Sequence, residues 1–259
     1  MTHVPPSPTA RISLVGAGPG CADLITLRGV RRLQEADVIF YDRLVDPELL
    51  ALARPGAERV FVGKTPGVAA WSQARINRLL VAAARAGKRV VRLKSGDPGV
   101  FGRASEEIAA LAEAGFAAEI VPGVTAASAA AAELGRALTD RASGRTLAIV
   151  SGHPATGAPP VDFAALARAE ATLAIYMGVA RAGETARALI AGGAAPATPV
   201  DIVERAGAPD ARRVATTLGA LEAAIRAHGV RNPAILLVAP PRRADAAAPL
   251  PAPVPALAG

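Results

Sequence analysis

Short runs rich in β-branched residues alternate with alanine-rich helical segments along most of this 259-residue chain. The predicted strands are Ile12–Val15, Val38–Tyr41, Arg59–Val62, Val90–Leu93, Glu119–Val121, Thr146–Ser151, Thr172–Met177, Pro199–Val203 and Ile235–Val238. The predicted helices are Leu24–Glu35, Gln73–Ala86, Ser105–Ala114, Ala126–Leu134, Phe163–Ala167, Gly183–Ala191 and Leu218–His228. Regular alternation of strands and helices predicts an α/β fold.

Residues at the helix ends support this assignment. Ser105 is the expected N-cap of the third helix, and the two glutamates that follow it suit the positive end of a helix dipole. Glycines stand where helix C-caps are expected, at Gly87, Gly115, Gly192 and Gly229.

The predicted strands fall into two sets, which indicates two α/β domains rather than one. We place the first domain at residues 11–122 and the second at residues 123–240. Residues 1–10 are polar and interrupted by prolines, and residues 241–259 are rich in proline and alanine. Because neither segment has the composition to form a core, we expect both to be disordered.

A glycine-rich loop, Gly16–Gly20, follows the first predicted strand and is similar to a dinucleotide-binding fingerprint. The third glycine of that fingerprint is replaced by Cys21. Pro19 has no N–H to donate to a phosphate. The expected ribose-binding acid is met only nominally, by Asp37 or Asp42. We therefore reject a pyrophosphate site and retain a loop that faces some other ligand.

The chain carries a net charge of +7 and a pI of about 10.6, which is compatible with nucleic-acid binding. Only 3% of its residues are aromatic, however, and the basic residues are spread along the chain. Base-stacking surfaces are therefore scarce, so we predict no nucleic-acid partner. A small polyanionic substrate suits the charge equally well.

Cys21 is the only cysteine, which excludes an intramolecular disulfide and argues against a thiolate metal site. We predict no metal. No apolar run is long enough to span a membrane, and the N-terminus is unlike a signal peptide. We therefore expect a cytoplasmic protein that has no membrane partner.

Four loops that follow predicted strands combine glycines with charged or polar residues. They contain Asp42 and Arg43; Lys64; Lys94, Asp97 and Arg103; and Thr125 and Ser128. Each loop alone is compatible with a solvated surface turn. Because ligands of open α/β sheets bind outside the carboxyl ends of the strands, the four together predict one site at one edge.

The loop motifs occur in a family-specific order. They are VGAGPG…LITLRG, YDRLV, GK, GDPGVFGR…EE, VPGVTAASA, SGH, YMGVA and PVDIVERA, which lie between residues 11 and 238. This pattern resembles the uroporphyrinogen-III C-methyltransferases of the tetrapyrrole methylase superfamily. The resemblance implies two α/β domains with an active-site cleft between them, and it implies a homodimer.

The resemblance also implies a cofactor, S-adenosylmethionine, with S-adenosylhomocysteine as its product. This cofactor carries no phosphate, so a proline in the glycine loop is compatible with it. The implied cofactor-binding residues are Pro19, Ser95, Gly96, Asp97, Val100, Thr125, Ala126, Met177, Ala206 and Ala234.

The implied reaction is methylation of uroporphyrinogen III at ring carbons C2 and C7, giving precorrin-2 for sirohaem or cobalamin synthesis. By resemblance, Asp42 is the candidate base and Lys64 is its acid or electrostatic partner. Arg43 and Arg103, with Lys64 as a further candidate, are expected to bind the substrate's carboxylates, for which arginine's planar fork is suited. Related fusion proteins carry an N-terminal dehydrogenase–chelatase module, so we expect oxidation and metal insertion to occur on another protein.

The chain departs from the family pattern at four positions. Ser95 replaces a usual glycine and Gly99 a frequent phenylalanine, while Ala69 and Ser72 stand where histidine and proline are common. The alternatives are a later precorrin C-methyltransferase, an RNA-modifying relative, and a binding protein without catalysis. Intact candidate residues argue against the last of these, and the YDRLV and YMG segments argue against the first.

Overall fold

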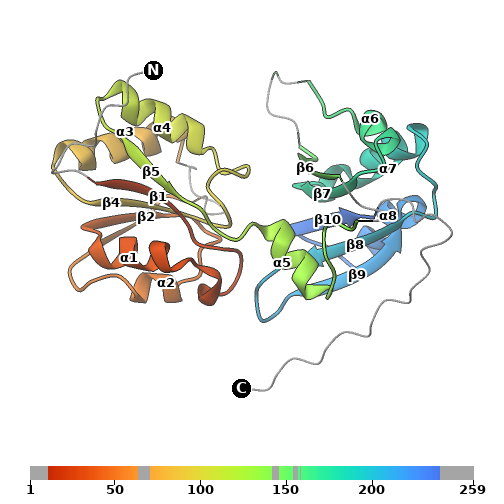
Figure 1. The fold of residues 1–259 in the computed structure, drawn as a ribbon, viewed down its shortest axis with the longest axis horizontal. Helices are drawn as coiled ribbons and strands as arrows, with labels where there is room; N and C mark the ends of the chain where they lie inside the picture. Colours follow the sequence, from red (N-terminus) through yellow and green to blue (C-terminus); the bar gives the residue numbers. More distant parts are fainter. Residues whose placement is uncertain (1–10, 64–70, 142–145, 154–156, 158, 240–259) are drawn as a thin grey trace. The chain divides into compact units, whose positions relative to one another are not determined.

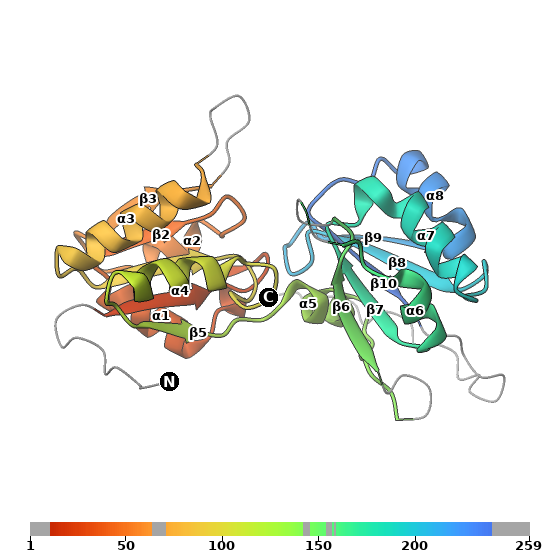
Figure 2. The ribbon, with the colours of Figure 1, turned by 90° about the horizontal axis from the view of Figure 1, so that it is seen from above.

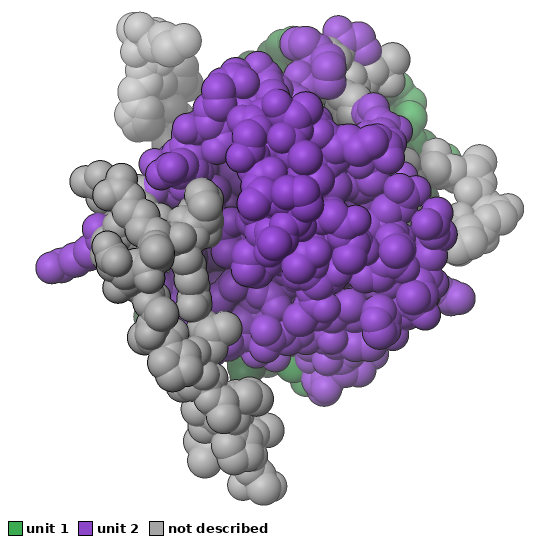
Figure 3. Space-filling view, turned by 90° about the vertical axis from the view of Figure 1, so that its right-hand side faces the viewer, with its two compact units in different colours: residues 1–126 green, residues 127–259 purple. Residues whose placement is uncertain are grey.

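The computed structural model describes residues 11–63, 71–141, 146–153, 157 and 159–239. The chain divides into two compact units, Met1–Ala126 and Ala127–Gly259, which Figure 3 colours separately. The predicted domain boundary after residue 122 lies in the loop between the last strand of unit 1 and helix α5 (Ala126–Glu133). The terminal segments predicted to be disordered lie outside the described residues.

Unit 1 contains a five-stranded sheet in the order β3-β2-β4-β1-β5. Its strands are β1 (Ile12–Gly16), β2 (Val38–Tyr41), β3 (Glu58–Phe61), β4 (Val90–Lys94) and β5 (Ala118–Val121). All neighbouring strands pair in parallel. The loops that follow the five strands therefore leave the sheet at the same edge.

Helices cover both faces of this sheet, as expected for parallel strands whose residues are buried on two sides (Figure 1). Helices α1 (Leu27–Glu35) and α2 (Glu48–Ala51) lie on one face, and α3 (Gln73–Arg85) and α4 (Ala104–Glu113) lie on the other. Leu33 of α1 is buried on the first face and Leu80 of α3 on the second, and neither side chain is exposed to solvent. Each such buried leucine contributes about 2 kcal/mol relative to an exposed one.

Unit 2 contains a mixed five-stranded sheet in the order β6-β7-β10-β8-β9. Its strands are β6 (Leu147–Ser151), β7 (Thr172–Tyr176), β8 (Pro199–Glu204), β9 (Arg212–Thr217) and β10 (Ala234–Val238). Strands β6 and β7 are parallel, whereas β10 is antiparallel to both β7 and β8. Figure 2 shows α6 (Phe163–Arg168), α7 (Ala182–Ala191) and α8 (Leu221–Ala227) on one side of the sheet.

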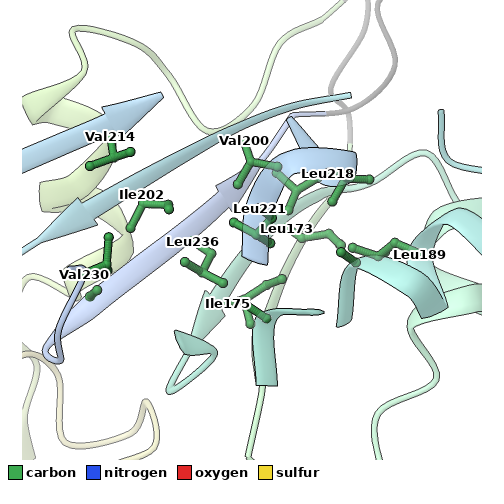
Figure 4. Close-up of a cluster of buried hydrophobic side chains, with 14 of the residues drawn as sticks. Leu173, Ile175, Leu189, Val200, Ile202, Val214, Leu218, Leu221, Val230 and Leu236 are labelled. Atoms are coloured by element: carbon green, nitrogen blue, oxygen red, sulfur yellow. The ribbon is translucent and has the colours of Figure 1, made fainter. Parts of the chain in front are cut away.

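The core of unit 2 lies between the sheet and helices α7 and α8 (Figure 4). Ile175 and Leu236 contribute from the strands, and Leu189 and Leu221 contribute from the helices. All four are buried. Ala182 and Ala186 of α7 are buried in the same core.

All nine predicted strands and all seven predicted helices are present, with shifts of a few residues at their ends. Strand β9 and the short helix α2 were not predicted. The prediction that Ser105 is an N-cap is wrong, because α4 begins at Ala104 and is capped by Arg103 in a left-handed conformation (φ 57°). After α7 the left-handed glycine is Gly193 (φ 104°) rather than Gly192. No helix in the described part of the chain is long and apolar enough to cross a membrane.

Candidate functional site

The loops after β1 and β4 are joined by backbone hydrogen bonds at the carboxyl edge of the unit 1 sheet. Gly18 donates to the Gly96 carbonyl (3.2 Å), and Gly96 donates to the Gly18 carbonyl (2.9 Å). Ala17 donates to the carbonyl of Lys94 (2.8 Å). The two glycine motifs, 78 residues apart in the sequence, therefore form one structural element.

A third loop, after β5, packs against these two through backbone atoms. A Cβ at Gly16 would lie 2.6 Å from the Cα of Gly123 and 2.7 Å from the carbonyl oxygen of Gly96. Contacts this short exclude a side chain. Glycine at positions 16 and 123 is therefore required by close approach of the backbone.

The carboxylate of Asp97 holds this arrangement together. One oxygen accepts from the N–H of Gly99 (2.7 Å), which closes an Asx turn, and the other accepts from Gly123 (2.9 Å). The side chain of Asp97 thus serves the loops themselves. We therefore expect any contact of this residue with a cofactor to come from its backbone.

The other unit 1 candidates for cofactor binding lie in these three loops or directly after them. Pro19 and Gly96 are buried, while Ser95 and Val100 are half-buried. Thr125 precedes the first residue of α5, which is Ala126, and both are half-buried.

The hydrogen-bond donors of the glycine loop suit a ligand without phosphate. The N–H groups of Ala17 and Gly18 are already bonded to the β4 loop, and Pro19 has none. Asp37, a nominal ribose-binding acid, forms ion pairs with Arg54 and Arg89 instead. It precedes β2 and so lies at the opposite edge of the sheet. The structure therefore agrees with the rejection of a dinucleotide site.

A network of four charged side chains lies beneath the same edge, on the face that α4 covers. Nη2 of Arg92 donates to both carboxylate oxygens of Asp42 (2.7 and 2.8 Å), and Nε donates to Glu107 (3.0 Å). The ammonium group of Lys94 donates to both oxygens of Glu107 (2.9 Å each). Two cations are thus matched by two carboxylates.

Burial differs sharply within this network. The side chains of Arg92, Lys94 and Glu107 are at most 4% exposed, whereas that of Asp42 is 31% exposed. Burial, and then the nearby Arg92 cation, lower the pKa of Lys94 below its ordinary value, although Glu107 opposes this shift.

Sequence reasoning named Asp42 and Lys94 as members of the candidate site loops, but it did not connect them and it missed Arg92 and Glu107. A signal was available. Arg92 and Lys94 alternate in a central strand that is otherwise apolar, and side chains two positions apart in a strand share a face. Buried charges require partners, so an acid facing this pair was to be expected.

The structure places the two predicted substrate-binding arginines differently. Arg43 is exposed and, among the described residues, forms no ion pair. Arg103 follows a strained loop in which Phe101 is also left-handed (φ 53°), and it pairs with Glu106 through two contacts of 2.7 Å. The predicted acid Lys64 and the departure Ala69 lie outside the described residues. Ser72 accepts from the N–H of Arg75 and caps α3.

The three cofactor-binding candidates of unit 2 lie at one edge of its sheet. Met177 directly follows β7, Ala206 follows the end of β8, and Ala234 begins β10. Since β10 runs antiparallel to the other two strands, its first residues pair with their last, Ala234 with Glu204 and Ile235 with Tyr176. Met177 is 46% exposed and left-handed (φ 55°).

The SGH and YMG motifs meet at this edge. Gly152 donates to the carbonyl of Tyr176 (2.7 Å), and a Cβ at Gly152 would lie 2.6 Å from the Cα of Gly178. The hydroxyl of Tyr176 accepts from the N–H of Ala127 in the first turn of α5 (2.8 Å). The motifs of unit 2, like those of unit 1, therefore form one connected set.

Comparison with known proteins identifies the family to which this chain belongs. The family described as Tetrapyrrole (Corrin/Porphyrin) Methylases matches residues 11–222. The siroheme synthase of Chromobacterium violaceum is 49% identical over 227 residues, 88% of this chain and 48% of that protein. Siroheme synthase 1 of Klebsiella pneumoniae is 46% identical over 234 residues, 90% of this chain and 49% of that protein. The chain thus spans about half the length of these curated relatives.

Solved structures agree with the family match. A uroporphyrin-III C-methyl transferase from Thermus thermophilus, complexed with S-adenyl homocysteine, is 43% identical with a TM-score of 0.73. The match covers 88% of this chain and 92% of that one. A cobalt precorrin-4 methyltransferase is 34% identical with a TM-score of 0.80, covering 88% of this chain and 94% of that one. The resemblance inferred from the motifs is thereby confirmed.

Proposed function

Because this chain belongs to the tetrapyrrole methylase family, we propose that it methylates uroporphyrinogen III at C2 and C7 to give precorrin-2. The methyl donor is S-adenosylmethionine, and S-adenosylhomocysteine is released. Identity of 43% to the Thermus thermophilus enzyme, over nearly its whole length, supports this substrate.

The observation that carries the proposal is the hydrogen-bonded pair of glycine loops with Asp42 on the neighbouring strand. Strands β1, β4 and β2 are consecutive in the sheet, so the loops and Asp42 emerge side by side. The N–H groups of Ala17 and Gly18 are already bonded to the β4 loop and Pro19 has none, so these loops offer few free N–H donors. A ligand without phosphate, such as one built from an amino acid and adenine, suits loops of this kind.

The cofactor supplies an electrophilic methyl group, so the residues of this chain orient the reactants and handle a proton. In each transfer a bond forms between a pyrrole carbon and the methyl carbon, and the sulfur–methyl bond breaks to leave a neutral thioether. The ring then carries a positive charge until a proton leaves. Asp42 is partly exposed at the sheet edge, and we assign it as the acceptor of that proton.

Substrate binding requires cations, because uroporphyrinogen carries many carboxylates. Arg43 is exposed and has no described acidic partner, so it is free to pair with one of them. Arg103 pairs with Glu106, so a substrate carboxylate would have to compete with Glu106 for its guanidinium group. We retain Lys64 as the predicted acid or electrostatic partner.

A second candidate substrate is a later corrin-pathway intermediate. The TM-score of 0.80 to a cobalt precorrin-4 methyltransferase supports it, but the sequence identity is lower at 34%. The cofactor contacts in both units, homodimerisation and a cytoplasmic location remain predictions carried over from the family resemblance.

Incubation with uroporphyrinogen III and S-adenosylmethionine under reducing conditions tests the proposal. We expect a product heavier by two CH2 units, because each methyl group gained is balanced by a proton lost, with the absorbance of precorrin-2 and two equivalents of S-adenosylhomocysteine. A parallel incubation with cobalt precorrin-4 decides between the two substrates. Methylation of cobalt precorrin-4 without methylation of uroporphyrinogen III would overturn the proposed substrate.

A further inference from the structure

Arg92 uses each of its three guanidinium nitrogens on a different partner. Nη2 binds the carboxylate of Asp42, Nε binds Glu107, and Nη1 donates to the carbonyls of Phe40 (3.3 Å) and Leu93 (3.1 Å). A guanidinium group fixed on three sides cannot rotate away from Asp42. Its planar fork makes this possible, and a lysine has no equivalent geometry.

Glu107 is the anchor on which this arrangement depends. It is fully buried in the first turn of α4 and accepts from Arg92, from both contacts of Lys94, and from Gln73 (3.2 Å). A buried carboxylate without partners would be strongly destabilising. With these partners Glu107 binds Nε of Arg92, while Asp42 binds Nη2 at the solvent-facing end of the same guanidinium group.

The network is asymmetric, and its exposed end is the candidate base. The fully buried members have no access to a substrate, whereas Asp42 is 31% exposed. A carboxylate has about four lone-pair sites, of which the Arg92 contacts use two. Asp42 thus keeps acceptor capacity toward solvent while its orientation is set from inside the protein.

We propose that Arg92 is a positioning residue, which is fixed by Glu107 and Lys94 and aims the Asp42 carboxylate at the reacting ring carbon. This inference rests on the proposed function and on the role of Asp42 within it. It assigns a task in the reaction to a buried guanidinium group that touches neither substrate nor cofactor. It also explains why a central strand keeps two buried cations where apolar residues would pack well.

Steady-state kinetics of Arg92→Lys and Arg92→Met test the proposal, with uroporphyrinogen III and S-adenosylmethionine as substrates. We expect kcat to fall about 100-fold, because small misplacement of a catalytic group has effects of this size. The KM values should stay within about twofold, and so should the Kd of S-adenosylhomocysteine measured by calorimetry. A purely structural role predicts parallel losses in affinity and melting temperature, and that result would overturn the proposal.

The same substitution in an Asp42→Asn background measures whether Arg92 acts through Asp42. If it does, Arg92→Lys has no further effect on single-turnover rates in that background, since coupled residues are not additive. If the two rate losses multiply in the double variant, Arg92 acts independently of Asp42, and that result would contradict the proposal. Should Asp42→Asn have no measurable rate, the split between kcat and KM decides.

Two controls separate the positioning role of Arg92 from the general effect of losing an ion pair and from the proposed function itself. Arg32→Met breaks an ion pair between α1 and Glu119 (2.7 Å), which is near the amino end of β5 and away from the carboxyl ends of the strands, and should leave kcat unchanged. Wild-type turnover of uroporphyrinogen III is measured first. Its absence refutes the proposed function, whereas normal turnover with an unaffected Arg92→Lys variant refutes only the positioning role.

Discussion

Gly18 and Gly96 exchange two backbone hydrogen bonds, of 3.2 and 2.9 Å, across the carboxyl edge of the unit 1 sheet. This pair links the loop after the first strand to the loop after the fourth. Glycine at Gly16 and Gly123 lets a third loop pack on the pair. The candidate cofactor surface of unit 1 is therefore a single backbone assembly, sensitive to a single added methyl group.

Gly16→Ala is expected to weaken cofactor binding. The new Cβ would lie 2.6 Å from the Cα of Gly123, so backbone rather than a flexible side chain must move. We expect the Kd of S-adenosylhomocysteine, measured by calorimetry, to rise about tenfold or more, equivalent to about 1.4 kcal/mol.

The control for this substitution is Gly115→Ala. Gly115 follows the end of α4 with φ 85°, and a Cβ added there would meet no atom within 4 Å, so only backbone strain results. It should cost about 1 kcal/mol of stability and leave cofactor affinity unchanged. Equal affinities for the two variants would show that close packing of the loops is irrelevant to binding.

Asp42→Ala is expected to abolish most turnover while the cofactor still binds. A general base contributes about 100-fold to 10,000-fold to a reaction rate. The reason for retained affinity is that Asp42 bonds to Arg92 and none of its described contacts involves the glycine loops. Turnover is measured by release of S-adenosylhomocysteine. An unchanged kcat would remove Asp42 from the mechanism.

Arg43→Met is expected to raise the KM for uroporphyrinogen III with little change in the KM for S-adenosylmethionine. Loss of one charge-assisted hydrogen bond to a substrate carboxylate should raise this KM about tenfold. Arg59→Met is the matched control, because Arg59 is an exposed arginine on β3 that pairs with no described acid. Similar KM values for both variants would indicate a general charge effect instead of a specific contact.

Acid is expected to destabilise unit 2 through Glu204. Burial raises the pKa of this carboxyl, but hydrogen bonds from Arg212 and from the N–H of Arg231 outweigh it and hold the pKa below 4.5. The folded pKa is thus lower than the unfolded one. Glu204 therefore adds stability above pH 4.5, and this contribution disappears as the pH falls through the folded pKa.

Urea unfolding followed by circular dichroism, above and below pH 4.5, measures this contribution. Glu204→Gln should lose stability at neutral pH and show a shallower decline in acid than the wild type. Arg212→Met should show the same change, since it removes the cation that stabilises the ionised form. An identical pH dependence in all three proteins would contradict the assignment.

The sequence predicted the strands and most helices because hydrophobic periodicity and glycine punctuation are local properties. It did not predict β9, where Arg212 and Arg213 interrupt the apolar pattern because they pair with Glu204 and Asp201 on the neighbouring strand. It also misplaced the start of α4. A left-handed arginine as N-cap is imposed by the loop after β4 and has no local signature.

The sequence by itself determined the family, the α/β class and the loops that carry the candidate site, because these depend on motifs and on local pattern. Only the tertiary structure decided which loops touch and which charges pair. Arg92 and Asp42 are 50 residues apart, and their contact exists because the strand order places β2 beside β4. Strand order follows from packing of the whole unit, so no local pattern encodes that contact.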